Sequence, residues 1–467
     1  MEEIIVHNDN LHLVSADLAN YYKVLPKDNT TESIALYCLE TKNTSEVKEE
    51  LELLLGKKVN LLSYSETQIN KALSIYYRKE RIENSTKAFN IDSGDFLENL
   101  LTEAKGLKSS DIHCEIYEDS ARIRFRIDGQ LIERYKIERE NYLELVNKIK
   151  IRSKLNITEK RLPQDGRITT PSFDIRVSIL PTLYGEKIVM RLLGQDASNI
   201  DLKSLGFQHE ELDGYLEAVK KPNGIILISG PTGSGKTTTL YATLRLLNDS
   251  RRNIVTVEDP IEYTLKGINQ VQLKEDIGLT FASALKSFLR QDPDVIMLGE
   301  IRDSETALMA IRASLTGHLV LSTIHTNSAI GTVSRLIDMG VPPYLISETL
   351  NLSVAQRLIR KLCNHCKEET TIDAKDFPNS FSIPYKVKKT YKSVGCNECF
   401  HTGYKGRTAI YEVINITNDI ANAIKSNTIA TYFEKDDNYK SLPEKAYDVL
   451  AKGETSLDEI YSILLNV

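Results

Sequence analysis

The sequence has no apolar run of the ~20 residues that a membrane-spanning helix needs, and its longest runs, such as the one opening at Ile225, are much shorter. It also has no excess of positive charge: 59 lysines and arginines face 65 aspartates and glutamates, a net charge of −6. That balance argues against broad non-specific binding to nucleic acid. The acidic start at Met1 lacks the basic and apolar stretches of a secretory signal. We therefore expect a cytoplasmic protein that meets membranes only peripherally.

The chain also lacks any fixed-period repeat or low-complexity tract, which excludes a solenoid. Its 467 residues are too many for one hydrophobic core, so several domains are expected. We predict a small N-terminal adaptor domain over residues 1–77 and a charged linker over 78–90. An α+β domain over 91–200 and a larger α/β domain over 201–467 follow.

The α+β domain is predicted from a strand in which Arg122, Arg124 and Arg126 alternate with apolar residues. Asp128-Gly129 then supplies the turn of a hairpin. A helix near 142–155 and strands over 173–180 and 187–193 complete it. The alternating arginines are equally compatible with a solvated strand face.

In the larger domain, apolar strands over Gly224–Ser229, Asn253–Glu258, Asp294–Leu298 and Leu319–Thr323 alternate with helical patterns. This alternation predicts a parallel sheet covered by helices on both faces. The chain ends in a predicted helical cap, where Ser456 and Glu459 have the spacing of a capping box.

A phosphate-binding loop follows the first of these strands and opens a helix-like segment. Its pattern is G-x-x-x-x-G-K-[ST], which indicates binding of ATP with Mg²⁺. The glycines let backbone N–H groups surround phosphate oxygens, Lys236 reaches the β- and γ-phosphates, and the Thr237 hydroxyl can ligate Mg²⁺. The predicted nucleotide-binding residues are Gly230, Pro231, Thr232, Gly233, Ser234, Gly235, Lys236, Thr237 and Thr238.

Hydrolysis also needs a carboxylate at the end of a neighbouring strand, to position water or complete the magnesium shell. Glu300 ends the run that begins at Val295 and is the first candidate. Asp294 stands at the beginning of that strand and is interpreted as a capping or turn residue. Glu258, Asp259 and Glu262 end another strand and could reach the same cleft. The alternative for each of these carboxylates is a solvated turn.

Four cysteines form two CxxC pairs, Cys363 with Cys366 and Cys396 with Cys399. The two-residue spacing turns both thiolates of a pair toward one ion, and four thiolates predict a tetrahedral structural Zn²⁺ site in a loop over 363–399. A thiol redox role and free core cysteines are the alternatives.

Beyond residue 90 the sequence resembles the secretion ATPases of type II secretion and type IV pilus assembly, often called GspE- or PilB-like. The resemblance rests on the phosphate loop and the CxxC pairs together with six further motifs. These are Ser110-Asp111-Ile112-His113, Arg124 to Gly129, Val257 to Tyr263, Ile301-Arg302-Asp303 after Glu300, Ser322 to Asn327, and Thr402 to Arg407.

The resemblance implies a RecA-like P-loop ATPase domain preceded by a PAS-like α+β domain. It also implies that Glu258, Asp259 and Glu262 form an acidic box and that Glu300 belongs to a variant Walker B motif. His325 would sense nucleotide, and Arg176 and Arg191 would reach the γ-phosphate across a domain or subunit cleft. A homo-hexamer is implied, at the inner face of the cytoplasmic membrane. Its implied partners are an inner-membrane platform protein and a membrane-associated adaptor.

Two other functions remain open from the sequence. One is a pilus retraction or DNA-uptake motor, although the negative charge weighs against nucleic acid and similar retraction motors generally lack the four cysteines. The other is a nucleotide-binding scaffold without turnover, against which Lys236, Thr237 and Glu300 argue.

Overall fold

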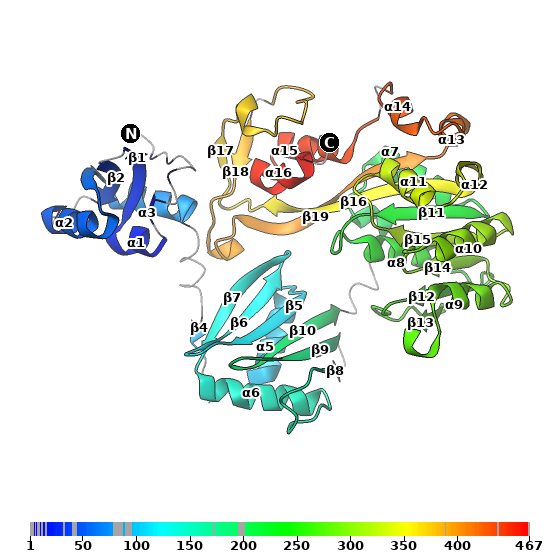
Figure 1. The fold of residues 1–467 in the computed structure, drawn as a ribbon, viewed down its shortest axis with the longest axis horizontal. Helices are drawn as coiled ribbons and strands as arrows, with labels where there is room; N and C mark the ends of the chain where they lie inside the picture. Colours follow the sequence, from blue (N-terminus) through cyan, green and yellow to red (C-terminus); the bar gives the residue numbers. More distant parts are fainter. Residues whose placement is uncertain are drawn as a thin grey trace.

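The computed structural model describes residues 4, 6, 10, 13–14, 16–30, 33–39, 44–77, 87–88, 96–170, 173–194, 201–387, 389–436 and 439–465. These residues form a three-stranded sheet, two seven-stranded sheets and a small two-stranded sheet (Figure 1). Every helix in the described ranges is too short or too polar to traverse a bilayer.

The first sheet has the strand order β1-β2-β3, antiparallel and then parallel. Its strands and helices are α1 (Ala16–Tyr22), β1 (Val24–Asn29), β2 (Ser33–Leu39), α2 (Thr44–Leu55), β3 (Lys58–Tyr64) and α3 (Glu66–Tyr76). The helices and strands enclose their own hydrophobic core. This segment is the one we predict to be the adaptor domain.

The second sheet has the order β4-β7-β6-β5-β10-β9-β8. Its elements are β4 (Lys87–Ala88), α5 (Phe96–Gly106), β5 (Asp111–Ile116), β6 (Ala121–Ile127), β7 (Gln130–Ile137), α6 (Arg139–Arg152), β8 (Gln164–Thr169), β9 (Phe173–Thr182) and β10 (Gly185–Gly194). Strand β4 pairs with β7, so two residues of the predicted linker belong to this sheet, while residues 78–86 and 89–90 lie outside the described residues.

Helices α5 and α6 cover one face of the second sheet, and its apolar side chains join them in one core. Ile123 and Phe125 of β6 point into that core, while the arginines between them point to the opposite face. The predicted half-buried strand is therefore confirmed.

The third sheet has the order β13-β12-β14-β15-β11-β16-β19. Its elements begin with α7 (His209–Val219), β11 (Gly224–Ser229), α8 (Lys236–Leu247), β12 (Ile254–Glu258), β13 (Asn269–Gln272), α9 (Phe281–Phe288), β14 (Val295–Leu298), α10 (Ser304–Leu315), β15 (Leu319–Ile324), α11 (Ala329–Asp338), α12 (Pro343–Thr349) and β16 (Leu350–Leu362). They continue with β17 (Glu368–Thr370), β18 (Thr390–Lys392), β19 (Tyr404–Asn415), α13 (Asn418–Lys425), α14 (Ile429–Phe433), α15 (Leu442–Ala451) and α16 (Leu457–Leu464).

Strand β11 shows why this sheet needs helices on both faces. All six of its residues are buried. Ile225 and Leu227 pack with α9, α10 and α11, whereas Ile226 and Ile228 pack with α7 and α8 on the opposite face. A strand buried on both faces is typical of parallel α/β sheets. The predicted α/β fold with a parallel sheet is confirmed.

The sheet extends further than predicted, through two long strands. Strand β16 runs parallel to β11, and β19 pairs antiparallel with β16 as the edge strand. The second half of β16 has apolar residues at Ala355, Leu358, Ile359 and Leu362, a spacing that equally suits a helix. Pairing with both neighbours, which no local pattern reveals, makes it a strand.

The predicted capping box at the end of the chain is wrong. Ser456 precedes α16, but its hydroxyl lies 2.6 Å from the Tyr404 hydroxyl and does not cap the helix. The Glu459 carboxylate accepts from the backbone N–H (2.9 Å) and the guanidinium of Arg360 on β16. The ion pair with Arg360 replaces the predicted cap, and it attaches α16 to β16 of the third sheet.

Candidate functional site

The phosphate loop joins β11 to α8 at the carboxyl edge of the third sheet. Gly230 has φ +147° and Gly235 has φ +90°, and a Cβ at either position would lie 2.5 to 2.8 Å from atoms of Gln356 on β16. The buried Ser234 hydroxyl has no hydrogen-bond partner among the described residues. Thr237 is exposed in the first turn of α8. This close-packed backbone with an unsatisfied hydroxyl suits the binding of a phosphate chain.

Lys236 is buried inside the loop, and its ammonium donates to the carbonyl oxygens of Gly230 (2.8 Å) and Pro231 (3.0 Å). Burial lowers its pKa, the charge of Glu300 opposes this, and the nearby Arg357 adds to the lowering. A buried ammonium whose partners are neutral carbonyl oxygens is strongly stabilised when an anion binds beside it. Lys236 is therefore poised for phosphate oxygens.

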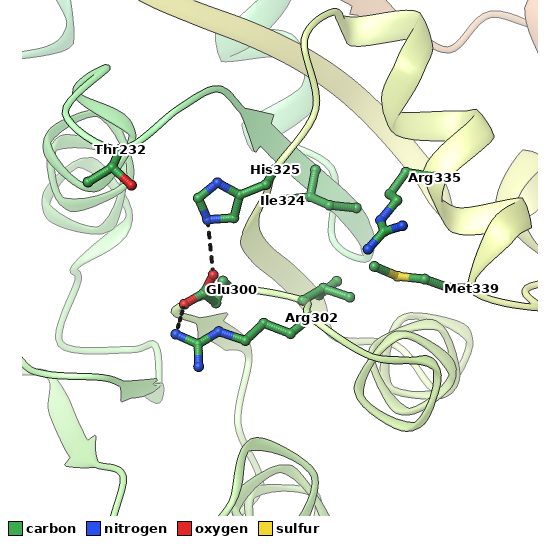
Figure 2. Close-up of a pocket in the computed structure, with 8 residues that line it drawn as sticks. Thr232, Glu300, Arg302, Ile324, His325, Arg335 and Met339 are labelled. Atoms are coloured by element: carbon green, nitrogen blue, oxygen red, sulfur yellow. Dashed lines mark hydrogen bonds and ion pairs between the residues drawn. The ribbon is translucent and has the colours of Figure 1, made fainter.

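Glu300 follows β14 and faces the same edge of the sheet. One carboxylate oxygen lies 3.1 Å from His325 Nε2, and the other accepts from Arg302. Figure 2 shows the carboxylate between these two side chains, with Thr232 of the phosphate loop to one side of His325 and Arg335 of α11 to the other. Burial would raise the pKa of Glu300, but the hydrogen bond and charge of Arg302, together with His325, leave it below its usual value. Glu300 is therefore ionised at neutral pH.

The three acidic residues at the end of β12 and just after it have different surroundings. Glu258 is buried and accepts from Tyr241 of α8, from Thr256 (2.6 Å) and from Gln270 (3.1 Å). Burial and the charge of Glu258 raise the pKa of Tyr241, which remains a donor. Glu258 is thus fully engaged in tying α8 to β12.

The other two acidic residues lie nearer to arginines. Asp259 lies 3.8 Å from Arg302, so it belongs to the surroundings of Glu300. Glu262 accepts from Arg176 of β9 at 3.2 Å, and Arg176 also donates to the Ile261 carbonyl. The second sheet therefore contacts the acidic segment of the third through Arg176.

Arg191 does not make the equivalent contact, although it lies directly opposite Arg176 across the β9–β10 pair. Its guanidinium pairs with Asp111 of β5 at 3.1 Å, and its side chain is 58% exposed. Arg122 and Arg124 both pair with the buried Glu115. Among the described arginines of this sheet face, Arg176 is the one that contacts the segment after β12.

Sequence reasoning missed several residues around this site. Arg302 lies in a motif we quoted, but nothing in the sequence indicated that it holds Glu300. Tyr241 was not singled out from the sequence, although it donates to the buried carboxylate of Glu258. Arg357 belongs to the unrecognised strand β16, and its guanidinium lies 3.2 Å from the position of a Cβ on Gly230. Asp294 stands just before β14, at the opposite end of that strand from Glu300, and its carboxylate accepts from the Asn253 backbone N–H at 2.6 Å.

The four cysteines of the CxxC pairs lie together at the far end of β16 and β19. Their sulfur atoms are all within 4.8 Å of one another, with Cys363–Cys396, Cys366–Cys399 and Cys396–Cys399 each at 3.8 Å. A tetrahedral ion with Zn–S bonds of ~2.3 Å requires S···S distances of ~3.8 Å. A disulfide would require ~2.05 Å. The sulfur geometry fits one zinc ion.

Backbone N–H groups support the thiolates of this cluster. Gly395 N–H donates to Cys366 Sγ and Gly403 N–H to Cys399 Sγ, both at 3.3 Å. Such bonds orient metal ligands and favour their charged form. The cluster is closed by four protein ligands, which suits a structural role.

Comparison with known proteins places these features in one family. The model of the family "Type II/IV secretion system protein" matches residues 93–462. The type IV pilus assembly ATPase PilB of Myxococcus xanthus is 39% identical over 98% of this chain and 87% of its own length. The type II secretion system ATPase E of Vibrio cholerae is 46% identical over 78% of this chain and 74% of its own length.

Among solved structures, the pilus retraction motor PilT with bound ADP superposes with a TM-score of 0.55. The two are 26% identical, and the match covers 78% of this chain and 96% of that one. The sequence identity to the assembly and secretion ATPases, 39% and 46%, is higher.

Proposed function

Because the chain belongs to the type II/IV secretion system protein family, we propose that it is an ATPase that drives assembly of a type IV pilus or a type II secretion pseudopilus. The observation that carries this proposal is the meeting of Lys236, Glu300 and His325 at one edge of the sheet. They follow β11, β14 and β15, and the order β14-β15-β11 makes these strands neighbours. Phosphate binding and a water-orienting carboxylate are thus combined in one place.

In the proposed reaction, a water oxygen attacks the γ-phosphorus and the bond to the β–γ bridging oxygen breaks, giving ADP and inorganic phosphate. The backbone N–H groups of residues 230–238, of which Pro231 alone has none, and the Lys236 ammonium would hold the phosphates. Glu300 orients the water and accepts its proton, and His325 holds Glu300 and responds to the γ-phosphate. Mg²⁺, held by Thr237, would neutralise charge on the β- and γ-phosphates. Asp259 and Glu262 lie at the rim, and Glu258 keeps α8 aligned.

Arg176 and Arg191 are proposed to stabilise charge on the γ-phosphate from the second sheet, in the same chain or a neighbouring one. A guanidinium suits this role because its charge is permanent and its planar fork matches phosphoryl oxygens. Arg176 would exchange its contact with Glu262 for phosphate when ATP binds. That exchange would move the second sheet relative to the third, which converts hydrolysis into domain motion.

The motor is proposed to act as a homo-hexamer at the inner face of the cytoplasmic membrane. An inner-membrane platform protein would receive the motion, and the first sheet and its helices, within residues 1–77, would dock on a membrane-associated adaptor. No contact with nucleic acid is proposed. These assignments rest on the family of assembly and secretion ATPases.

Phosphate release by the purified full-length chain with saturating Mg·ATP tests the activity. We expect steady turnover that Lys236→Ala abolishes, because the phosphates lose their buried cation. Isothermal titration with ATP measures binding in both proteins. A Lys236→Ala protein that turns over like the parent would overturn the assignment of the loop.

Zinc is proposed to occupy the cluster of four thiolates, and we expect elemental analysis of reduced protein to find one zinc per chain. Cys396→Ser should raise hydrogen exchange over residues 363–404 while leaving the Kd for ATP nearly unchanged, because the cluster lies at the far end of β16 and β19. Cys38→Ser, at a buried cysteine of the first sheet, is the control. Finding no zinc in the reduced protein would refute the site.

A pilus retraction motor is the competing assignment, favoured only by the fold similarity to the retraction motor structure. Deleting the gene separates the two. Loss of surface fibres or of secreted proteins is expected for an assembly motor, whereas accumulation of fibres that do not retract would favour the alternative.

A further inference from the structure

Side chains from β16 and β19 hold the turn that carries His325 and the start of the helix that follows it. This turn comprises residues 325–328, between β15 and α11. The carbonyl of Asn327 accepts from the Arg357 guanidinium at 3.0 Å. The N–H of Ala329, the first residue of α11, donates to the Glu412 carboxylate at 2.8 Å. A cation and an anion therefore hold consecutive parts of one backbone segment.

Glu412 lies in the same row of paired residues across the third sheet as the ends of β15 and β11, which precede the histidine turn and the phosphate loop. Across the sheet, Ile324 pairs with Ser229, Ser229 with Ala355, and Ala355 with Glu412. Ile324 is the residue before His325, and Ser229 is the residue before the phosphate loop. This row places Glu412 where a shift of its carboxylate acts on the histidine turn and on the start of α11.

The same carboxylate holds the C-terminal helical segment, residues 439–465. The Tyr439 hydroxyl donates to it at 2.7 Å, and the N–H of Leu442, the first residue of α15, donates at 3.3 Å. The first amides of two helices, α11 and α15, therefore share one acceptor. Each helix N-terminus carries partial positive charge, so both favour a carboxylate there.

Burying this carboxylate is energetically unfavourable, because Glu412 is 1% exposed and no lysine, arginine or histidine of the described residues lies within ion-pair distance of it. Burial raises its pKa, although the hydrogen bonds from Tyr439 and the backbone donors oppose the shift. A neutral acceptor side chain could anchor β19 to a helix with a smaller desolvation penalty than a buried carboxylate. A buried carboxylate that accepts from three donors instead makes the positions of those donors interdependent.

We propose that Glu412 is a positioning residue for ATP hydrolysis, which couples the C-terminal helical segment to the histidine turn. Displacing this segment removes donors from Glu412, loosens the start of α11 and misplaces His325 against Glu300. Arg335 of α11 and Met339, the residue that follows this helix, line the pocket in Figure 2, so this part of the wall moves with α11. The inference rests on the proposed roles of His325 and Glu300.

Tyr439→Phe tests the coupling, because it removes one hydrogen bond to Glu412 from the C-terminal side only. In the full-length chain we expect kcat to fall roughly tenfold, with KM for ATP unchanged. Hydrogen exchange of residues 325–331 should rise. Tyr385→Phe is the matched control: its hydroxyl donates at 2.6 Å to Asp448 of the same helix α15, away from Glu412.

Comparing Tyr439→Phe with Tyr385→Phe tests whether the C-terminal helical segment is coupled to the histidine turn. A purely structural role predicts equal kcat and equal exchange over 325–331 in both, and that result would overturn the coupling. If Glu300→Gln still abolishes turnover in the same preparations, only this inference fails and the ATPase assignment stands. Glu412→Gln should reduce kcat more than Tyr439→Phe, since it replaces an acceptor with a donor that faces other donors.

Discussion

Replacing Glu300 with glutamine is expected to reduce kcat by ~10³-fold while leaving the Kd for Mg·ATP nearly unchanged. The amide keeps the shape of the side chain but cannot accept the proton of the attacking water. The phosphate loop, Lys236 and Thr237 remain intact, so binding persists. Phosphate release and isothermal titration on the same preparation separate the two quantities.

Glu305→Gln is the matched control for this substitution. Glu305 lies at the start of α10, is largely exposed and pairs with Lys286 at 2.9 Å. The change of charge is the same, but the residue lies outside the pocket. Exposed pairs of this kind contribute little, so turnover should match the parent. Full turnover in Glu300→Gln would remove Glu300 from the mechanism.

The second large effect is expected for Arg176→Gln, which should lower kcat by ~10³-fold if the guanidinium stabilises the γ-phosphate. Arg167→Gln is the control, because Arg167 lies directly opposite Arg176 across the β8–β9 pair and is held by Asp174. Arg191→Gln shows whether the second arginine of the row shares the role. Equal turnover in Arg176→Gln and Arg167→Gln would exclude a role of Arg176 at the γ-phosphate and leave it only the contact with Glu262.

Mixing variants shows where Arg176 acts. Arg176→Gln and Glu300→Gln are each expected to be inactive alone. If the arginine reaches the site of a neighbouring chain, mixed assemblies of the proposed hexamer would contain sites with both residues intact and regain part of the activity. If it acts within its own chain, mixing restores none.

The elements nearest to the nucleotide site could be predicted because their signals are local. A glycine-rich octapeptide between a buried strand and a helix specifies the backbone of the phosphate loop, and the strand before Glu300 is a short, wholly apolar run. The same is true of the cysteines, whose two-residue spacing sets the direction of both thiolates. In each case the residues that make the structure are neighbours in the sequence.

The remaining features depend on partners far apart in the chain. Arg176 and Arg191 look alike in the sequence, yet one meets Glu262 and the other Asp111, and only the packing of the second sheet against the third distinguishes them. Glu258, Asp259 and Glu262 look like one acidic box, but burial beside Tyr241 separates the first from the others. Glu459 has ideal spacing for a cap and binds Arg360 instead.

The two long strands β16 and β19 have a mechanical consequence. From Ala355, beside the phosphate loop, to Leu362, beside the first cysteine, the ribbon spans seven residues, or about 23 Å at ~3.3 Å per residue. A tilt of about 10° at the inner end would sweep the tip through about 4 Å over that arm. The cluster of four thiolates lies at the outer end of this arm, so a tilt of that size around a bound triphosphate would displace it by about the length of a side chain.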